Sequence, residues 1–208
     1  MSAISEPVGT STAFITNYIE SNCSDLSVNP RFFIITGGPG VGKTSIINKL
    51  ANSYSVGMEA AADVISRELS LGIETPWALD GFREKIVALQ KQRQQELLAK
   101  NVHMAFFDRS PIDTMSYCLH FGAVPTAELQ HNVQEVVREG YYSRTVFFIE
   151  HLGFTEQTEI RAEADEESLA IGEKIKESYR NLGFKIIFIP KDTIEERVKS
   201  ILAHIESE

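Results

Sequence analysis

Residues 31–44 read RFFIITGGPGVGKT, and this stretch decides the fold. It contains the pattern G-x-x-x-x-G-K-[ST], with Gly37, Gly42, Lys43 and Thr44 at the fixed positions. The apolar run FFII before the loop is typical of a buried strand, and SIINKLANSY after it repeats apolar residues at helical spacing. Strand, glycine-rich loop and helix in this order predict a phosphate-binding loop at the amino terminus of a helix.

Each residue type of the loop meets a requirement of phosphate binding. Glycines allow the backbone to turn so that successive N–H groups converge on phosphate oxygens, and Pro39 stiffens the turn. The Lys43 ammonium is expected to reach the β- and γ-phosphates, and the Thr44 hydroxyl to bind Mg²⁺. The predicted nucleotide-binding residues are Gly37, Gly38, Pro39, Gly40, Val41, Gly42, Lys43, Thr44 and Ser45.

Length, composition and charge narrow the classes of protein. The chain has 208 residues, of which 43% are hydrophobic and 24% charged, as expected for one soluble globular domain. A net charge of −9 argues against nucleic-acid binding and against an anionic membrane surface. No apolar run approaches the ~20 residues of a membrane span, and the two cysteines lie far apart. We therefore expect a cytoplasmic protein with no membrane or nucleic-acid partner.

Short apolar runs separated by helical patterns predict an α/β fold. Five such runs favour a doubly wound parallel sheet with helices on both faces and the site along the carboxyl edge of the strands. The strands are expected near residues 32–35, 54–58, 102–108, 145–150 and 184–190. Helices are expected at 60–70, 79–100, 112–120 and 126–138, and after Thr193, which with Glu196 predicts a capping box.

Two segments fall outside this regular pattern. Residues 1–30 are predicted to form an N-terminal extension with a short amphipathic helix, ahead of a domain at 31–208. Eight acidic residues between Glu156 and Glu177 predict an exposed, mobile element, interpreted as a helical lid at about 153–180. Arg161 in this lid is a candidate for transition-state charge, or else a solvated helix residue.

Three further charged residues follow strands of the predicted sheet. Asp108 closes an apolar strand and is a candidate Mg²⁺ ligand, with a turn or capping aspartate as the alternative. Arg109 is a candidate phosphate contact or a structural ion-pair partner. Glu59 follows the second strand and is a candidate base that orients an acceptor hydroxyl, or else an acid that stabilises a helix amino terminus. The predicted catalytic residues are Lys43, Glu59, Asp108, Arg109 and Arg161, and the predicted metal ligands are Thr44 and Asp108.

The sequence also resembles a known family. The segments ITGGPGVGKTS, EAA at 59–61, FFDRSPIDTMSY and YRNLGFKIIFIP, with Glu196, Arg197 and Val198 in the last helix, are similar to the NadR-type AAA/P-loop ATPase domain, which is itself similar to nucleoside and nucleotide kinases. The resemblance spans about residues 31–205. It implies five parallel strands in the order 2-3-1-4-5, ATP or GTP with Mg²⁺, and phosphate contacts from Gly38 to Thr44 and from Arg109.

Two functions are compatible with these features. The leading hypothesis is an ATP-dependent kinase that acts on a small, nucleoside-like acceptor, with Glu59 or Asp108 orienting the acceptor. The alternative is a nucleotide-dependent switch or ATPase that regulates a macromolecular partner. The chain has no N-K-x-D guanine motif, which favours ATP over GTP without excluding GTP. Trp77 is a candidate for stacking on a base or for packing, and Pro190, Lys191 and Asp192 for the border of the base.

Overall fold

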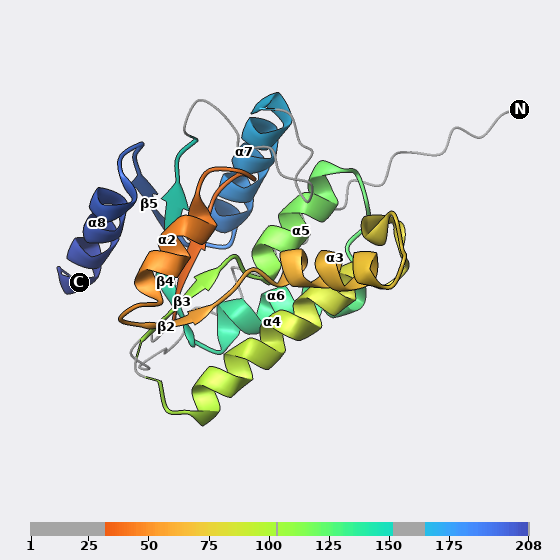
Figure 1. Ribbon diagram of the computed structural model, residues 1–208, viewed down its shortest axis with the longest axis horizontal. Helices are drawn as coiled ribbons and strands as arrows, with labels where there is room; N and C mark the ends of the chain where they lie inside the picture. Colours follow the sequence, from red (N-terminus) through yellow and green to blue (C-terminus); the bar gives the residue numbers. More distant parts are fainter. Residues whose placement is uncertain (1–31, 103, 152–164, 208) are drawn as a thin grey trace, which may run out of the picture.

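The fold is a parallel sheet between two layers of helices. The computed structural model describes residues 32–102, 104–151 and 165–207 (Figure 1). The strands are β1 (Phe32–Thr36), β2 (Ser55–Gly57), β3 (Ala105–Asp108), β4 (Tyr142–Ile149) and β5 (Lys185–Ile189). The helices are α2 (Lys43–Leu50), α3 (Ala60–Ser70), α4 (Phe82–Ala99), α5 (Pro111–His120), α6 (Ala127–Arg138), α7 (Asp165–Asn181) and α8 (Ile194–Glu206), with a 3₁₀ helix η1 (Pro76–Ala78).

All five strands run parallel in the order β2-β3-β1-β4-β5. This order confirms the predicted topology. The central strands β1 and β3 are buried along their whole length, because helices cover both faces of the sheet. Their carboxyl ends lie side by side, with Ile35 in register with Asp108, so the loops after β1 and β3 meet at one edge.

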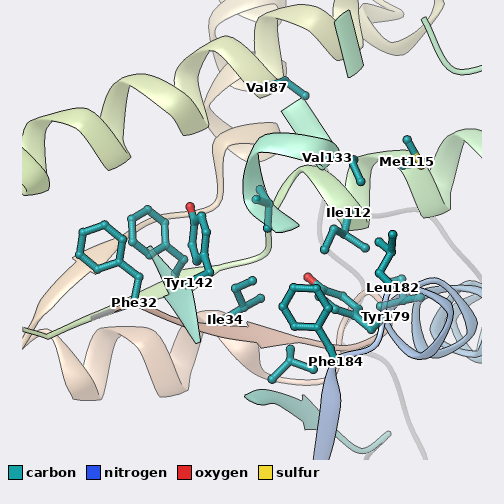
Figure 2. Close-up of a cluster of buried hydrophobic side chains, with 14 of the residues drawn as sticks. Phe32, Ile34, Val87, Ile112, Met115, Val133, Tyr142, Tyr179, Leu182 and Phe184 are labelled. Atoms are coloured by element: carbon teal, nitrogen blue, oxygen red, sulfur yellow. The ribbon is translucent and has the colours of Figure 1, made fainter. Parts of the chain in front are cut away.

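The two faces of the sheet carry separate apolar cores. On one face, α2 and α8 pack over strand residues such as Phe33, Ile35 and Phe147. On the other face, helices α4 to α7 cover a larger cluster that includes Phe32, Ile34 and the α7 residue Tyr179 (Figure 2). Figure 1 shows α2 and α8 on one side of the strands and α4, α5 and α6 on the other. Helix α3 lies outside this layer and packs against α4.

Local signals in the sequence explain where several helices begin. The Ser110 side chain accepts a bond from the Ile112 amide and forms a capping box with Asp113, and Pro111 fixes the first turn of α5. The Thr193 hydroxyl accepts a bond from the Glu196 amide at 3.2 Å and starts α8. Helix α2 begins after Gly42, whose left-handed backbone (φ 87°) glycine adopts without strain.

The structure differs from the sequence-based expectations in the acidic segment. Residues 152–164, which include Arg161, lie outside the described residues, as does the predicted N-terminal extension. From Asp165 onward the predicted lid is the helix α7, and its residues Ile171, Ile175 and Tyr179 are fully buried. Glu166, Glu173 and Glu177 lie on the exposed side of α7, whereas apolar residues at helical spacing face the core, so this part of the acidic segment is one side of a packed amphipathic helix. Among the described residues, no helix is long and apolar enough to cross a bilayer.

Candidate functional site

The loop between β1 and α2 is fixed by close backbone packing. Gly37 has φ 141°, and a Cβ at this position would lie 2.6 Å from the carbonyl oxygen of Ile149. A Cβ on Gly38 would lie 2.5 Å from the carbonyl oxygen of Ser168 in α7. The loop therefore needs glycine at both positions, one for its conformation and one for the approach of α7.

Lys43 lies buried inside this loop. Its side chain is 1% exposed, and its Nζ donates to the carbonyl oxygens of Gly38 at 2.5 Å and Gly37 at 3.2 Å. An ammonium held by two carbonyls at the amino terminus of a helix is a cation at the place where a phosphate is expected. The lysine can exchange these carbonyls for phosphate oxygens with a small movement of a flexible side chain.

Thr44 and Asp108, the two predicted metal ligands, are in contact. The Thr44 hydroxyl donates to Oδ2 of Asp108 at 3.2 Å, and Asp108 itself is 1% exposed. The contact arises because β3 lies beside β1, so the end of β3 reaches the first turn of α2. A hydroxyl and a carboxylate are oxygen ligands of the kind that Mg²⁺ prefers, and the ion takes its remaining ligands from phosphates and water. The residues present therefore fit a magnesium nucleotide.

Arg109 is held in an uncommon backbone conformation beside the loop. Its φ is 70°, which non-glycine residues rarely adopt, and its side chain is buried. Nε donates to Oε1 of Glu59 at 2.9 Å, and the guanidinium also donates to the carbonyl oxygen of Gly37 at 3.3 Å and to the Tyr117 hydroxyl at 3.2 Å. Burial lowers the pKa of Arg109, but Tyr117, Glu59, Asp113 and Asp108 raise it by more, so the guanidinium stays charged.

Glu59 follows β2 and precedes the first turn of α3. Its side chain is 13% exposed and pairs with Arg109, so the two predicted charged residues lie together although 50 positions separate them. The ion pair foreseen as the structural alternative for Arg109 is thus present. It does not decide against a phosphate contact, because the same guanidinium also touches the loop at Gly37.

The remaining predicted residues lie apart from this cluster or outside the described part of the chain. Arg161 lies outside the described residues. Trp77 is 56% exposed on η1, so it is a surface residue rather than part of the core. Ser45 is exposed on the first turn of α2, and Pro190, Lys191 and Asp192 directly follow β5.

Sequence reasoning missed two side-chain groups that support the site. The first is a buried polar cluster formed by Ser110, Asp113 and Tyr179, whose only sequence signal is the S-x-x-D capping pattern in DRSPID. The second is Arg197 on α8, which donates to the carbonyl oxygens of Val41, Glu150 and Pro190 and so joins the loop to the ends of β4 and β5. Burial lowers the pKa of Arg197 below the usual arginine value.

A pocket of about 340 Å³ opens beside the loop. The loop contributes Gly38 and Val41 to its lining, and the end of β4 contributes Glu150 and His151. The side of α7 that faces it carries Ser168, Leu169, Gly172, Glu173 and Lys176. The pocket places polar and charged groups next to the backbone of the predicted phosphate cradle.

Comparisons with known proteins agree with this geometry. A family model described as an AAA domain matches residues 32–197. The chain belongs to this AAA domain family. No curated protein sequence matches it significantly. The glycine-rich loop after β1 and the strand order β2-β3-β1-β4-β5 are those of a P-loop domain.

Three solved structures share the fold at low sequence identity. Thymidylate kinase from Ehrlichia chaffeensis has a TM-score of 0.58 at 13% identity, over 86% of this chain and 100% of that one. Deoxyadenosine kinase from M. mycoides, with dCMP and dCDP bound, has a TM-score of 0.53 at 15% identity, over 85% of this chain and 100% of that one. NadR protein, in complex with NAD and AMP-PNP, has a TM-score of 0.54 at 15% identity, over 84% of this chain but 49% of that one.

Proposed function

We propose that the protein is a magnesium-dependent kinase that transfers the γ-phosphoryl group of ATP to a hydroxyl or phosphate of a small, nucleoside-like acceptor. The observation that carries the proposal is the position of Arg109. This buried cation contacts the phosphate-loop carbonyl of Gly37 and the Glu59 carboxylate at the same time. One side chain therefore links the predicted phosphate cradle to a candidate base for an acceptor.

On the donor side, the chain supplies backbone N–H groups and cations for the triphosphate. Lys43 exchanges its bonds to Gly37 and Gly38 for bonds to the β- and γ-phosphates, and Arg109 adds charge where negative charge accumulates during transfer. Thr44 and Asp108 would hold Mg²⁺, which would neutralise phosphate charge when bound. Catalysis of this kind rests on positioning and electrostatics rather than on a covalent enzyme intermediate.

On the acceptor side, we assign the base to Glu59 rather than to Asp108. The Asp108 carboxylate accepts the Thr44 hydroxyl and lies on the metal side of the loop. Glu59 lies one strand further out, after β2, and is the more accessible of the two carboxylates. A carboxylate there can accept the proton of an acceptor hydroxyl while Arg109 fixes its orientation.

The fold neighbours support a nucleoside-like acceptor. Two of them are a thymidylate kinase and a deoxyadenosine kinase, and the NadR structure contains an ATP analogue. An acceptor of this class presents hydroxyl or phosphate groups on a flat, partly apolar body. We place the acceptor next to the Glu59–Arg109 pair, at the carboxyl edge of the sheet.

The test follows the fate of the γ-phosphate. Purified protein with Mg²⁺ and γ-labelled ATP is incubated with nucleosides, nucleoside monophosphates and vitamins that contain a ribose, and both labelled acceptor and inorganic phosphate are measured. The proposal expects one acceptor class to be phosphorylated faster than ATP is hydrolysed, with Lys43→Ala as the inactive control. Rapid ATP hydrolysis without transfer to any acceptor would support the nucleotide-dependent switch instead.

A further inference from the structure

Helix α7 contacts the loop that follows β1 and the loop that follows β3. Near its start, the Ser168 hydroxyl donates to the carbonyl oxygen of Pro39 at 2.7 Å. Three turns later, about 16 Å along the helix, the Tyr179 hydroxyl reaches the loop that follows β3. Ser168, Gly172, Ile175 and Tyr179 recur at helical spacing, so one face of α7 carries both contacts.

The second contact is centred on the buried carboxylate of Asp113. Its Oδ2 accepts the Tyr179 hydroxyl at 2.6 Å and the Ser110 amide at 2.9 Å. Its Oδ1 accepts the hydroxyl of Thr36, the last residue of β1, and faces the Arg109 guanidinium at 3.5 Å. One carboxylate therefore joins the end of β1, the first turn of α5, helix α7 and the site arginine.

Tyr179 suits the role of a permanent hydrogen-bond donor. Its side chain is fully buried, with its ring against Phe184, and Figure 2 shows both in the cluster beneath α5. Burial raises the pKa of Tyr179 well above its ordinary value, and the charge of Asp113 and the hydrogen bond to it raise it further. The phenol keeps its proton across the range in which proteins work.

We propose that Tyr179 is a positioning residue: through Asp113 it fixes the Arg109 guanidinium against Gly37 and Glu59. Arg109 needs such support because its left-handed backbone and its burial are both costly without surrounding contacts. The catalytic importance of this arrangement rests on the function proposed above, whereas the fixing of Arg109 is a structural property that can be measured independently.

The decisive experiment compares Tyr179→Phe with the matched control Tyr142→Phe. Tyr142 is a second buried tyrosine of the same cluster, and its ring packs against Phe32 and Phe107. Hydrogen exchange of the Arg109 Nε–H is followed by ¹⁵N NMR, with the resonance assigned by its loss in Arg109→Lys. We expect exchange at least tenfold faster in Tyr179→Phe and within twofold of wild type in Tyr142→Phe. An unchanged rate in a folded Tyr179→Phe variant overturns the proposal, whether or not the protein is a kinase.

A second variant covers the case in which Tyr179→Phe fails to fold. Asp113→Asn keeps the shape of the side chain but removes the charge that faces Arg109, and it is expected to accelerate the same exchange at least tenfold. For phosphoryl transfer, both variants should lower kcat at least tenfold while nucleotide Kd stays within threefold. An unchanged Arg109 exchange rate in folded Asp113→Asn counts against the proposal. Wild-type protein that transfers no phosphate, but in which Tyr179→Phe accelerates the exchange, contradicts only the kinase function.

Discussion

The hydroxyl of Thr44 donates a hydrogen bond to the carboxylate of Asp108 at 3.2 Å, across 64 positions of sequence. The contact connects the first turn of α2 with the end of β3. It brings together two oxygen groups, one from the phosphate loop and one from the neighbouring strand, at the place where a magnesium nucleotide is expected. Its importance can be tested on Thr44, because serine keeps the hydroxyl and valine keeps the shape.

Thr44→Val is expected to lower kcat about 100-fold, which corresponds to roughly 2.7 kcal/mol of lost transition-state stabilisation. Without the hydroxyl, Mg²⁺ loses a protein ligand, so the Mg²⁺ concentration for half-maximal rate should also rise. Thr44→Ser should stay within tenfold of wild type in both quantities. Initial rates measured across a Mg²⁺ titration check this, and equal rates for the valine and serine variants would show that the hydroxyl binds no metal.

Glu59→Gln tests the assignment of the base. Glutamine retains a side-chain oxygen that can accept from Arg109 but cannot take a proton, so kcat should fall by about 10² to 10⁴. Nucleotide Kd should change less than threefold, because glutamine still accepts from Arg109 and so keeps the guanidinium beside Gly37. Steady-state kinetics and calorimetric nucleotide binding on the same preparations check both numbers. A variant that binds ATP poorly but transfers phosphate at the normal rate would assign Glu59 to the nucleotide site instead.

Gly38→Ala and Gly172→Ala form a matched pair at the contact between the loop and α7. A Cβ on Gly38 meets the Ser168 carbonyl oxygen at 2.5 Å, whereas a Cβ on Gly172 has its nearest neighbour at 3.6 Å. We expect Gly38→Ala to push the loop and α7 apart, lowering the melting temperature and weakening ATP binding at least tenfold. Gly172→Ala should be tolerated, or stabilise the helix by up to about 1 kcal/mol. Thermal unfolding with and without Mg·ATP measures both effects, and equal behaviour of the two variants would contradict the packing argument.

Alkaline pH should destabilise the protein through its buried tyrosines. Burial raises the pKa of Tyr142 far above the ordinary value near 10. Below pH 10 both folded and unfolded states keep the proton, whereas above it the unfolded state loses the proton first. The free energy of unfolding should then fall by about 1.4 kcal/mol per pH unit for this group. Urea unfolding from pH 9 to 11 should show this loss in wild type but a smaller slope in Tyr142→Phe, and equal slopes would mean that Tyr142 ionises in the folded state.

The fold was predictable from the sequence because its strands are short apolar runs that carry their own signal. The glycine-rich loop located the first strand, and the run VHMAFFD at 102–108 located its neighbour β3, which begins at Ala105. The strand order 2-3-1-4-5 followed from family resemblance rather than from periodicity, and the sheet confirms it. Strand ends were less accurate: β4 begins at Tyr142, because Ser143 and Arg144 continue the strand although their side chains are polar.

The candidate site was only partly predictable, since side-chain pairing depends on tertiary contacts. The sequence predicted Thr44 and Asp108 as ligands of one metal ion. In the structure their side chains are joined by a hydrogen bond. The spacing of Glu59 and Arg109 does not indicate their ion pair, and the sequence around Tyr179 does not indicate its hydrogen bond to Asp113. The hydrogen bonds of Arg197 to three backbone carbonyls likewise leave no pattern in the sequence, because carbonyl partners can belong to any residue type.

The central claim, that the loop from Gly37 to Thr44 binds a nucleoside triphosphate, is tested most directly by calorimetric titration of Mg·ATP into wild-type protein and Lys43→Ala. We expect micromolar binding by the wild type and at least 100-fold weaker binding by the variant, roughly 2.7 kcal/mol, with an unchanged fold by circular dichroism. Micromolar binding retained by a folded Lys43→Ala protein would contradict the assignment of the site.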